Sequence, residues 1–298
     1  MKRSHGLLLV AGLLLLAGWR VHPWLAVNAP TDARVLAVEG WLPTDRMPEV
    51  VTLARERGAE RIYVTGTERV FAYYIWPRER LELDLGQPFT GTLSLDASGV
   101  GGGFRLLGDG RTLLEHTVTG TPQVFTTTIE DPVRDLELQT LPNGASPDAP
   151  QLFIKDLHMN GTDVHRRMRS LRRIRANGDT LTGTPTHAEA AAEALIAAGW
   201  PADRLVVLPV TDAEGGRSAA NAQALAQAFR RDGIHAVDLV TLGVHARRSG
   251  RLLQRASGEE VQVGVISLAD PECPASTWWL QGSGWAKVAK ELVALCRD

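Results

Sequence analysis

The feature that most constrains the fold is a change of periodicity in the middle of the chain. On both sides of it, short apolar runs alternate with segments of helical spacing, beginning with residues 35–38 and 47–57. Such alternation is typical of parallel strands joined by right-handed helical crossovers. Between about residues 79 and 162 the helical period disappears, and short β patterns separated by turn residues replace it. The pattern predicts an α/β domain interrupted by a β module.

The α/β rhythm resumes after the interruption. Expected helices cover residues 186–198, 218–231, 247–256 and 285–296, and expected strands cover residues 61–65, 205–208, 237–242 and 261–266. With residues 35–38 this makes about five parallel strands. We therefore expect the class α/β, with an open, doubly wound, Rossmann-like and mostly parallel sheet.

The interrupting segment is predicted to be an inserted all-β sandwich. Residues 81–85 and 136–138 alternate strictly between apolar and polar side chains, and Asp109-Gly110 is typical of a hairpin turn. The expected boundaries are residues 75–164 for the insert, 30–74 together with 165–298 for the α/β domain, and 1–29 for an N-terminal hydrophobic anchor.

The amino terminus resembles an export signal. Lys2 and Arg3 precede an apolar block over residues 7–19. The block is short for a transmembrane helix and is followed by no clear cleavage site, which favours an uncleaved signal-anchor over a cleaved peptide. We expect one anchor in the cell membrane, with the soluble domain on the periplasmic or extracytoplasmic side.

Composition excludes several classes of protein. The 298 residues are 44% hydrophobic and carry a net charge of −2, which argues against a disordered chain, a polytopic membrane protein and a nucleic-acid binder. Two cysteines, Cys273 and Cys296, do not make a disulfide framework, and their pairing is left open.

An arginine-rich segment lies between the insert and the next helix. In residues 165–175, Met168, Leu171 and Ile174 are spaced three apart among six arginines, which predicts a helix with one apolar stripe. Two interpretations stay open: a basic face toward an anionic membrane, or a solvated helix packed through its apolar stripe.

Polar and aromatic residues gather where the expected strands end. Ligands of open parallel sheets bind beyond the carboxyl ends of the strands, so these residues are the candidate site. They are Glu39, Gly40 and Trp41 after the first strand, Thr65 and Gly66 after the second, Arg217 after the third, His245, Arg247 and Arg248 after the fourth, and Trp278 and Trp279 after the fifth.

The strongest local pattern follows the fourth strand. His245, Arg247 and Arg248 stand at the start of a helix, where free N–H groups and the helix dipole already favour an anion. They predict a phosphate or carboxylate site that Arg217 extends. His245 is the acid–base candidate, because histidine titrates near neutral pH.

The remaining candidates each have two interpretations. Glu39 either orients or deprotonates a substrate hydroxyl, or forms an ion pair with Arg248. Glu189 is a candidate for substrate binding, but it also completes a capping box with Thr186. Trp41 and the pair Trp278 and Trp279 either stack on a sugar or ring face or cover the core.

These motifs resemble a known family. The segments at 39–43, 64–66 and 239–249 are similar to the SanA/YdcF-like family (ElyC/SanA/YdcF), over residues 30–72 and 180–298. The resemblance implies an exported, single-anchor envelope protein linked to peptidoglycan and the envelope barrier. The chain departs from the family pattern at Thr67 and at residues 218–221.

The insert resembles a second family through residues 152–162. This stretch is similar to the calcium-dependent xylan-binding type of carbohydrate-binding module. The resemblance implies a sugar ligand and Ca²⁺, for which Asp131, Asp148 and Asp156 are the candidate ligands. No cofactor is predicted with certainty.

Together these observations predict a membrane-anchored, exported envelope protein that acts on or binds an anionic glycan, a glycan-lipid or a glycan precursor. An enzyme of this kind would be a hydrolase or transferase on a phosphate-bearing precursor, with His245 and Glu39 as its catalytic residues. Two alternatives stay open: a non-catalytic carbohydrate-binding assembly protein, and a nucleotide-like cofactor bound at the α/β edge.

Overall fold

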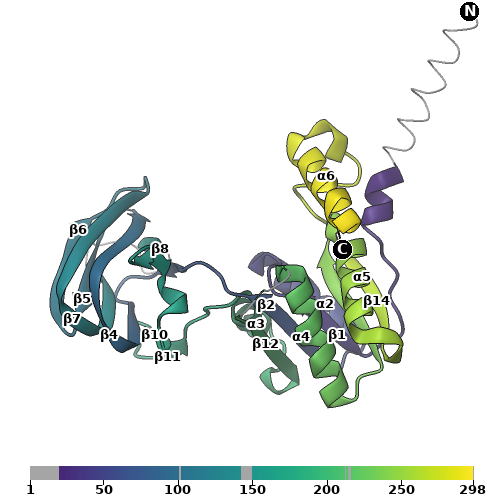
Figure 1. Ribbon diagram of the computed structural model, residues 1–298, viewed down its shortest axis with the longest axis horizontal. Helices are drawn as coiled ribbons and strands as arrows, with labels where there is room; N and C mark the ends of the chain where they lie inside the picture. Colours follow the sequence, from purple (N-terminus) through teal and green to yellow (C-terminus); the bar gives the residue numbers. More distant parts are fainter. Residues whose placement is uncertain (1–19, 101, 142–149, 212, 214–215, 298) are drawn as a thin grey trace, which may run out of the picture. The chain divides into compact units, whose positions relative to one another are not determined.

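The computed structural model describes residues 20–100, 102–141, 150–211, 213 and 216–297. These fall into two compact units (Figure 1). One, here called the α/β unit, lies within Met1–Thr67 and Thr186–Asp298, and the other, the β unit, is Glu68–Pro185. The expected anchor falls largely on residues 1–19, outside the described residues. In the described part of the chain, no helix is both long and apolar enough to cross a membrane.

The α/β unit is built on a five-stranded parallel sheet in the order β12-β2-β1-β13-β14. Because successive side chains of a strand point to opposite faces, both faces need cover. Helices α2 and α3 pack on one face and α4 and α5 on the other. The elements are β1 (Val35–Glu39), α2 (Met47–Glu56), β2 (Arg61–Thr67), α3 (His187–Ala197), β12 (Leu205–Val210), α4 (Arg217–Asp232), β13 (Ala236–Leu242), α5 (Ala246–Ser257), β14 (Gln262–Leu268) and α6 (Gly282–Arg297).

The β unit consists of one antiparallel nine-stranded sheet. Six strands follow the path β11-β10-β4-β7-β5-β6, and β3, β8 and β9 join through β8, which pairs with β4. The strands are β3 (Ala72–Ile75), β4 (Arg80–Gly99), β5 (Gly103–Gly108), β6 (Arg111–Thr117), β7 (Gln123–Leu141), β8 (Leu152–Met159), β9 (Thr162–Asp163), β10 (Ser170–Ile174) and β11 (Thr180–Thr182).

The expected fold class is therefore wrong. The chain is mostly β, because the antiparallel sheet is larger than the parallel one and strand residues outnumber helical residues. The expected sandwich of separate short strands is also wrong. Strands β4 and β7 are long and pair along both their halves, with register shifts between Asp84 and Phe89. Gly86 and Pro88, which have the composition of a turn, lie inside β4 at that irregularity.

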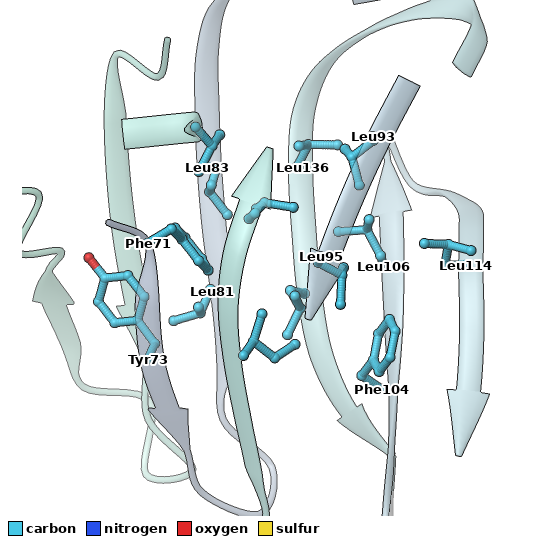
Figure 2. Packing of buried hydrophobic residues seen from close by; sticks show 14 of the residues in the cluster. Phe71, Tyr73, Leu81, Leu83, Leu93, Leu95, Phe104, Leu106, Leu114 and Leu136 are labelled. Atoms are coloured by element: carbon cyan, nitrogen blue, oxygen red, sulfur yellow. The ribbon is translucent and has the colours of Figure 1, made fainter. Parts of the chain in front are cut away.

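The core of the β unit is formed by alternate residues of these strands. Figure 2 shows their labelled leucine and aromatic side chains converging between the strands. Leu81 and Leu83 come from the first half of β4, and Leu93 and Leu95 from the second half. One cluster thus spans both halves of β4, which is why the unit has one core.

The arginine-rich helix expected over residues 165–175 does not form. A 3-10 helix, η2 (Val164–Arg166), is followed by β10, which pairs with β4 so that Leu171 lies opposite Leu83. Apolar side chains spaced three apart do not distinguish a helix from a turn plus a strand, and pairing with β4 decides between them. Arg172 forms an ion pair with Glu82 at 2.6 Å.

Candidate functional site

A pocket lies beyond the carboxyl ends of β1, β2 and β13, within the α/β unit. Its volume is about 380 Å³, and it is lined by Glu39, Trp41, Gly66, Thr67, His187, Arg217, Ser218, Asn221, His245, Arg248, Ser249, Lys290 and Glu291. Six of these residues are among the sequence candidates: Glu39, Trp41, Gly66, Arg217, His245 and Arg248. A larger hollow of about 630 Å³ lies near the opposite, amino-terminal edge of the sheet and contains none of the candidates.

Glu39 ends β1 and is almost completely buried, at 5% exposed. The Thr241 hydroxyl donates a short hydrogen bond to Glu39 Oε2, and the Ser249 hydroxyl donates to Oε1 at 3.0 Å. Burial raises the pKa of Glu39, and the Thr241 hydrogen bond and the nearby His245 oppose that rise. The predicted ion pair with Arg248 is not observed among the ion pairs of the described residues. Glu39 is instead held by two hydroxyls.

His245 is held between a carboxylate and an aromatic ring. It lies in the 3-10 helix η4 (Gly243–His245), at the start of α5. Its Nδ1 is 2.9 Å from Glu291 Oε1, and the edge of Trp41 approaches its ring with centroids 4.8 Å apart. The Glu291 side chain is fully buried, and neither of its oxygens has a hydrogen bond of ordinary geometry in the described part of the chain. The ring nitrogen thus lies close to a buried carboxylate without hydrogen-bond geometry between them.

Glu291 is the main residue that sequence reasoning missed. It lies on α6, at 3.6-residue spacing with the inward-facing Val288, Leu292 and Leu295. An acidic side chain on the apolar stripe of a helix is the signal that could have identified it, because an unpaired carboxylate is costly to bury. His187, Asn221 and Lys290 also line the pocket without having been predicted there.

Three cationic side chains complete the pocket. Arg217 begins α4, Arg248 lies in the first turn of α5, and Lys290 lies on α6. Arg248 Nη1 donates to the Ser218 hydroxyl at 3.4 Å. Two helices thus begin beside the pocket, where their free N–H groups add to the positive potential. The arrangement suits an anionic group.

Gly40 and Gly66 lie against the start of α3 and leave no room for a side chain, and Gly66 also lines the pocket. A Cβ on Gly40 would lie 2.6 Å from the carbonyl oxygen of His187, and a Cβ on Gly66 would lie 2.4 Å from the backbone nitrogen of Ala188. Both glycines let the start of α3 touch the sheet edge. Thr65 is fully buried, and its hydroxyl contacts the Asn221 amide oxygen at 3.4 Å.

Other candidates lie away from the pocket lining. Arg247 points toward Trp24, with its guanidinium carbon 4.3 Å from the ring centroid. Glu189 forms the capping box of α3, and its carboxylate accepts from the Thr186 backbone at 2.9 Å. Trp278 is buried, and Trp279 is 37% exposed. Trp278, in η6 (Trp278–Leu280), packs with Val288 of α6, and neither ring of the pair lines the pocket. Stacking of the pair on a ligand stays a prediction.

The expected calcium ligands do not converge in the described residues. Exposed Asp131 pairs with Arg111 at 2.9 Å, Asp156 pairs with Lys155 at 3.6 Å, and Asp148 lies outside the described residues. The described part of the chain contains no group of three or more His, Cys, Asp or Glu side chains placed to hold a metal. Cys273 and Cys296 are both free thiols.

The β unit has an aromatic pair in which Tyr74 is exposed and Phe153 is half-buried. Tyr74 on β3 lies opposite Phe153 on β8, and their rings are stacked at 4.5 Å with an interplanar angle of 29°. Tyr74 is 56% exposed. In the adjacent register, Lys155 forms an ion pair with Asp96 of β4 at 3.2 Å. A flat aromatic surface thus borders a polar pair on one face of the sheet.

Comparison with known proteins assigns the chain to no family. No family model matches it, and no curated protein matches it. Among solved structures, it is similar to a mutant of the carbohydrate-binding module CBM29-2, with 12% identity and a TM-score of 0.24 over 33% of this chain and 84% of that chain.

Two further solved structures are similar at the same level. The sugar-binding EclA C-terminal domain has 16% identity and a TM-score of 0.21 over 30% of this chain and 76% of that chain. A family two carbohydrate esterase from Clostridium thermocellum has 10% identity and a TM-score of 0.22 over 74% of this chain and 94% of that chain. These neighbours are carbohydrate-binding or carbohydrate-active proteins. At such TM-scores, function has to be argued from the site itself.

Proposed function

We propose that the α/β unit binds the phosphate or carboxylate of an anionic glycan or glycan precursor, and that His245 is the acid–base of a hydrolysis or transfer reaction there. The contact between His245 Nδ1 and the buried Glu291 supports this most directly. A proton on Nδ1, facing Glu291, leaves Nε2 as an acceptor for a proton from water or a sugar hydroxyl.

The charges around His245 support an anionic substrate. Glu39 and Glu291 are buried, whereas Arg217, Arg248 and Lys290 contribute three positive charges to the pocket lining. A guanidinium group can donate two parallel hydrogen bonds to a phosphate or carboxylate, which fixes the orientation of the bound group. We assign Arg217 and Arg248 to the anion, and Glu39 to a sugar hydroxyl near His245.

The glycan part of the proposal rests on the β unit. Sugar rings present flat C–H faces that pack on exposed aromatic side chains, and Tyr74 with Phe153 offers such a surface beside the Lys155 and Asp96 pair. Following the SanA/YdcF resemblance, we place the protein at the cell envelope, held by its amino-terminal segment.

The decisive experiment compares neighbouring arginines. Thermal unfolding of the full chain is measured with inorganic phosphate and with a panel of sugar phosphates, whose turnover is followed by phosphate release. Ligand binding should raise the unfolding temperature. Arg248→Gln should abolish the shift, whereas the matched control Arg247→Gln should retain it, because Arg247 faces Trp24. Equal shifts in both variants would refute the anion site.

A second candidate function is non-catalytic glycan binding, which the stacked pair of the exposed Tyr74 and the half-buried Phe153 favours. Glycan-array binding by the full chain distinguishes the two. The non-catalytic function is supported if Tyr74→Ala abolishes binding, His245→Gln leaves it intact, and no panel member is turned over. Turnover that His245→Gln abolishes supports the enzyme.

A further inference from the structure

Large apolar side chains are exposed together at the carboxyl-terminal end of the α/β unit. Trp279, Leu280, Trp285 and Val293 are 37%, 74%, 53% and 51% exposed. They lie on η6 and α6, and we call them the tryptophan face. The Trp285 indole donates to the Trp279 carbonyl at 3.0 Å, and both rings contact the buried Trp278. The exposed rings therefore belong to one packed cluster.

Helix α6 carries apolar side chains on two sides, besides the buried Glu291. Its inner side packs Val288, Leu292 and Leu295 against the unit. Its outer side exposes Trp285, Ala289 and Val293, spaced four residues apart and thus on one stripe. An exposed apolar stripe on a helix is typical of an interaction surface with a protein or a membrane.

Charged side chains lie beside this stripe, and one of them, Lys287, pairs with the exposed Glu272 at 2.8 Å. Among the described residues of α6, the exposed charged side chains are Lys290 and Arg297. Long cationic side chains can rest their stems on an apolar surface and extend their charge to lipid headgroups. Tryptophan also favours the membrane–water interface, because its ring is apolar and its N–H needs a polar partner.

The chain enters the fold beside the same helix. Residues 20–25 form a helical turn that lies near α6 in Figure 1. Leu25 is fully buried in the cluster of Trp278 and Val288, and the His22 ring is 2.9 Å from the Cys273 carbonyl oxygen. In the sequence, the apolar block of residues 7–19 directly precedes this turn. The turn that follows this block in the sequence thus packs against the cluster that also holds Trp278 and Val288.

We propose that the tryptophan face is an interfacial docking surface for a lipid bilayer, on which α6 lies parallel to the membrane plane. The helix has 16 residues, or about 24 Å at 1.5 Å per residue, which is too short to span ~30 Å of hydrocarbon. Trp279 and Trp285, which carry the docking surface, lie outside the pocket lining, so either proposal can fail without the other.

The test measures the depth of individual tryptophans. The full chain is reconstituted into phosphatidylcholine and phosphatidylglycerol vesicles with or without brominated acyl chains, which quench tryptophans at the interface. The double variant Trp279→Phe with Trp285→Phe should lower the quenched share of the emission. The matched control Trp200→Phe, which removes a buried indole, should raise that share. Circular dichroism checks that each variant is folded.

Two results overturn the proposal. One is a quenched share that stays the same or rises in the double variant. The other is a vesicle-independent dimer of the full chain, seen by sedimentation in detergent, that the substitution Trp285→Ser dissociates. That result assigns the face to a second copy of the chain.

Discussion

The substitution Gly66→Ala tests the close contact between β2 and α3 on which the pocket floor depends. The new Cβ would lie 2.4 Å from the backbone nitrogen of Ala188 and 2.7 Å from the Cβ of His187. Contacts under 3.0 Å force a movement, and here the neighbours are backbone and Cβ atoms. No rotamer change can therefore relieve the clash, and the first turn of α3 has to move away from the sheet.

The cost follows from overpacking. Adding atoms to a well-packed site costs about 1–3 kcal/mol, and we expect a value near the upper limit because a helix terminus has to shift. The shift also moves His187, which lines the pocket. Phosphate binding should therefore weaken together with stability.

Urea unfolding of the full chain, followed by tryptophan emission, measures the loss. Trp76 is the single tryptophan between residues 68 and 185, so the signal reports mainly on the α/β unit. Gly282→Ala is the matched control, because a Cβ there meets nothing within 4 Å, and its change should stay within about 0.5 kcal/mol. A loss under about 0.5 kcal/mol for Gly66→Ala would refute the reasoning.

Three further predictions concern buried groups. Burial raises the pKa of Glu39 above 4.5, so its contribution to stability is present below pH 4.5 and is lost as the pH rises through the folded pKa. Glu39→Gln should therefore gain stability relative to wild type as pH rises. If the difference in unfolding free energy between variant and wild type, measured by urea titration, is the same at pH 4 and pH 8, the prediction is wrong. Burial raises the pKa of the Cys273 thiol, so Cys273 should react with a thiol reagent only on unfolding, whereas the exposed Cys296 should react at once. Equal reaction rates of the two thiols in the native protein would contradict this expectation. Asp238→Ala should cost about 3–5 kcal/mol in urea unfolding, because fully buried Asp238 pairs with Arg57 at 2.6 Å; a loss under 1 kcal/mol would show that the pair is dispensable.

Parts of the site follow from local rules. Parallel strands end at one edge of a sheet, so residues that follow β1 and β13 had to come near each other, and Glu39, Trp41 and His245 line one pocket. The capping box of Thr186 and Glu189 is equally local, since both residues lie within one helical turn.

Other parts depend on contacts between distant segments. In the sequence, Trp278 is a candidate for stacking on a ligand, but in the structure its packing against Leu25 buries it. Glu291 follows His245 by 46 residues, and only the packing of α6 against η4 brings their side chains to 2.9 Å.

By itself, the sequence determined the parallel strands, the helices between them and the edge at which polar residues collect. The strands and helices follow from periodicity, and the edge follows because parallel strands joined by helical crossovers all end on the same side of the sheet. The tertiary structure decided the class of the chain as a whole. The nine-stranded sheet arises because β4 and β7 continue through residues that resemble a turn. It also decided the partner of His245 and the exposure of α6. Strand pairing and side-chain burial depend on which surfaces of distant segments meet in space, and periodicity along the chain does not determine this.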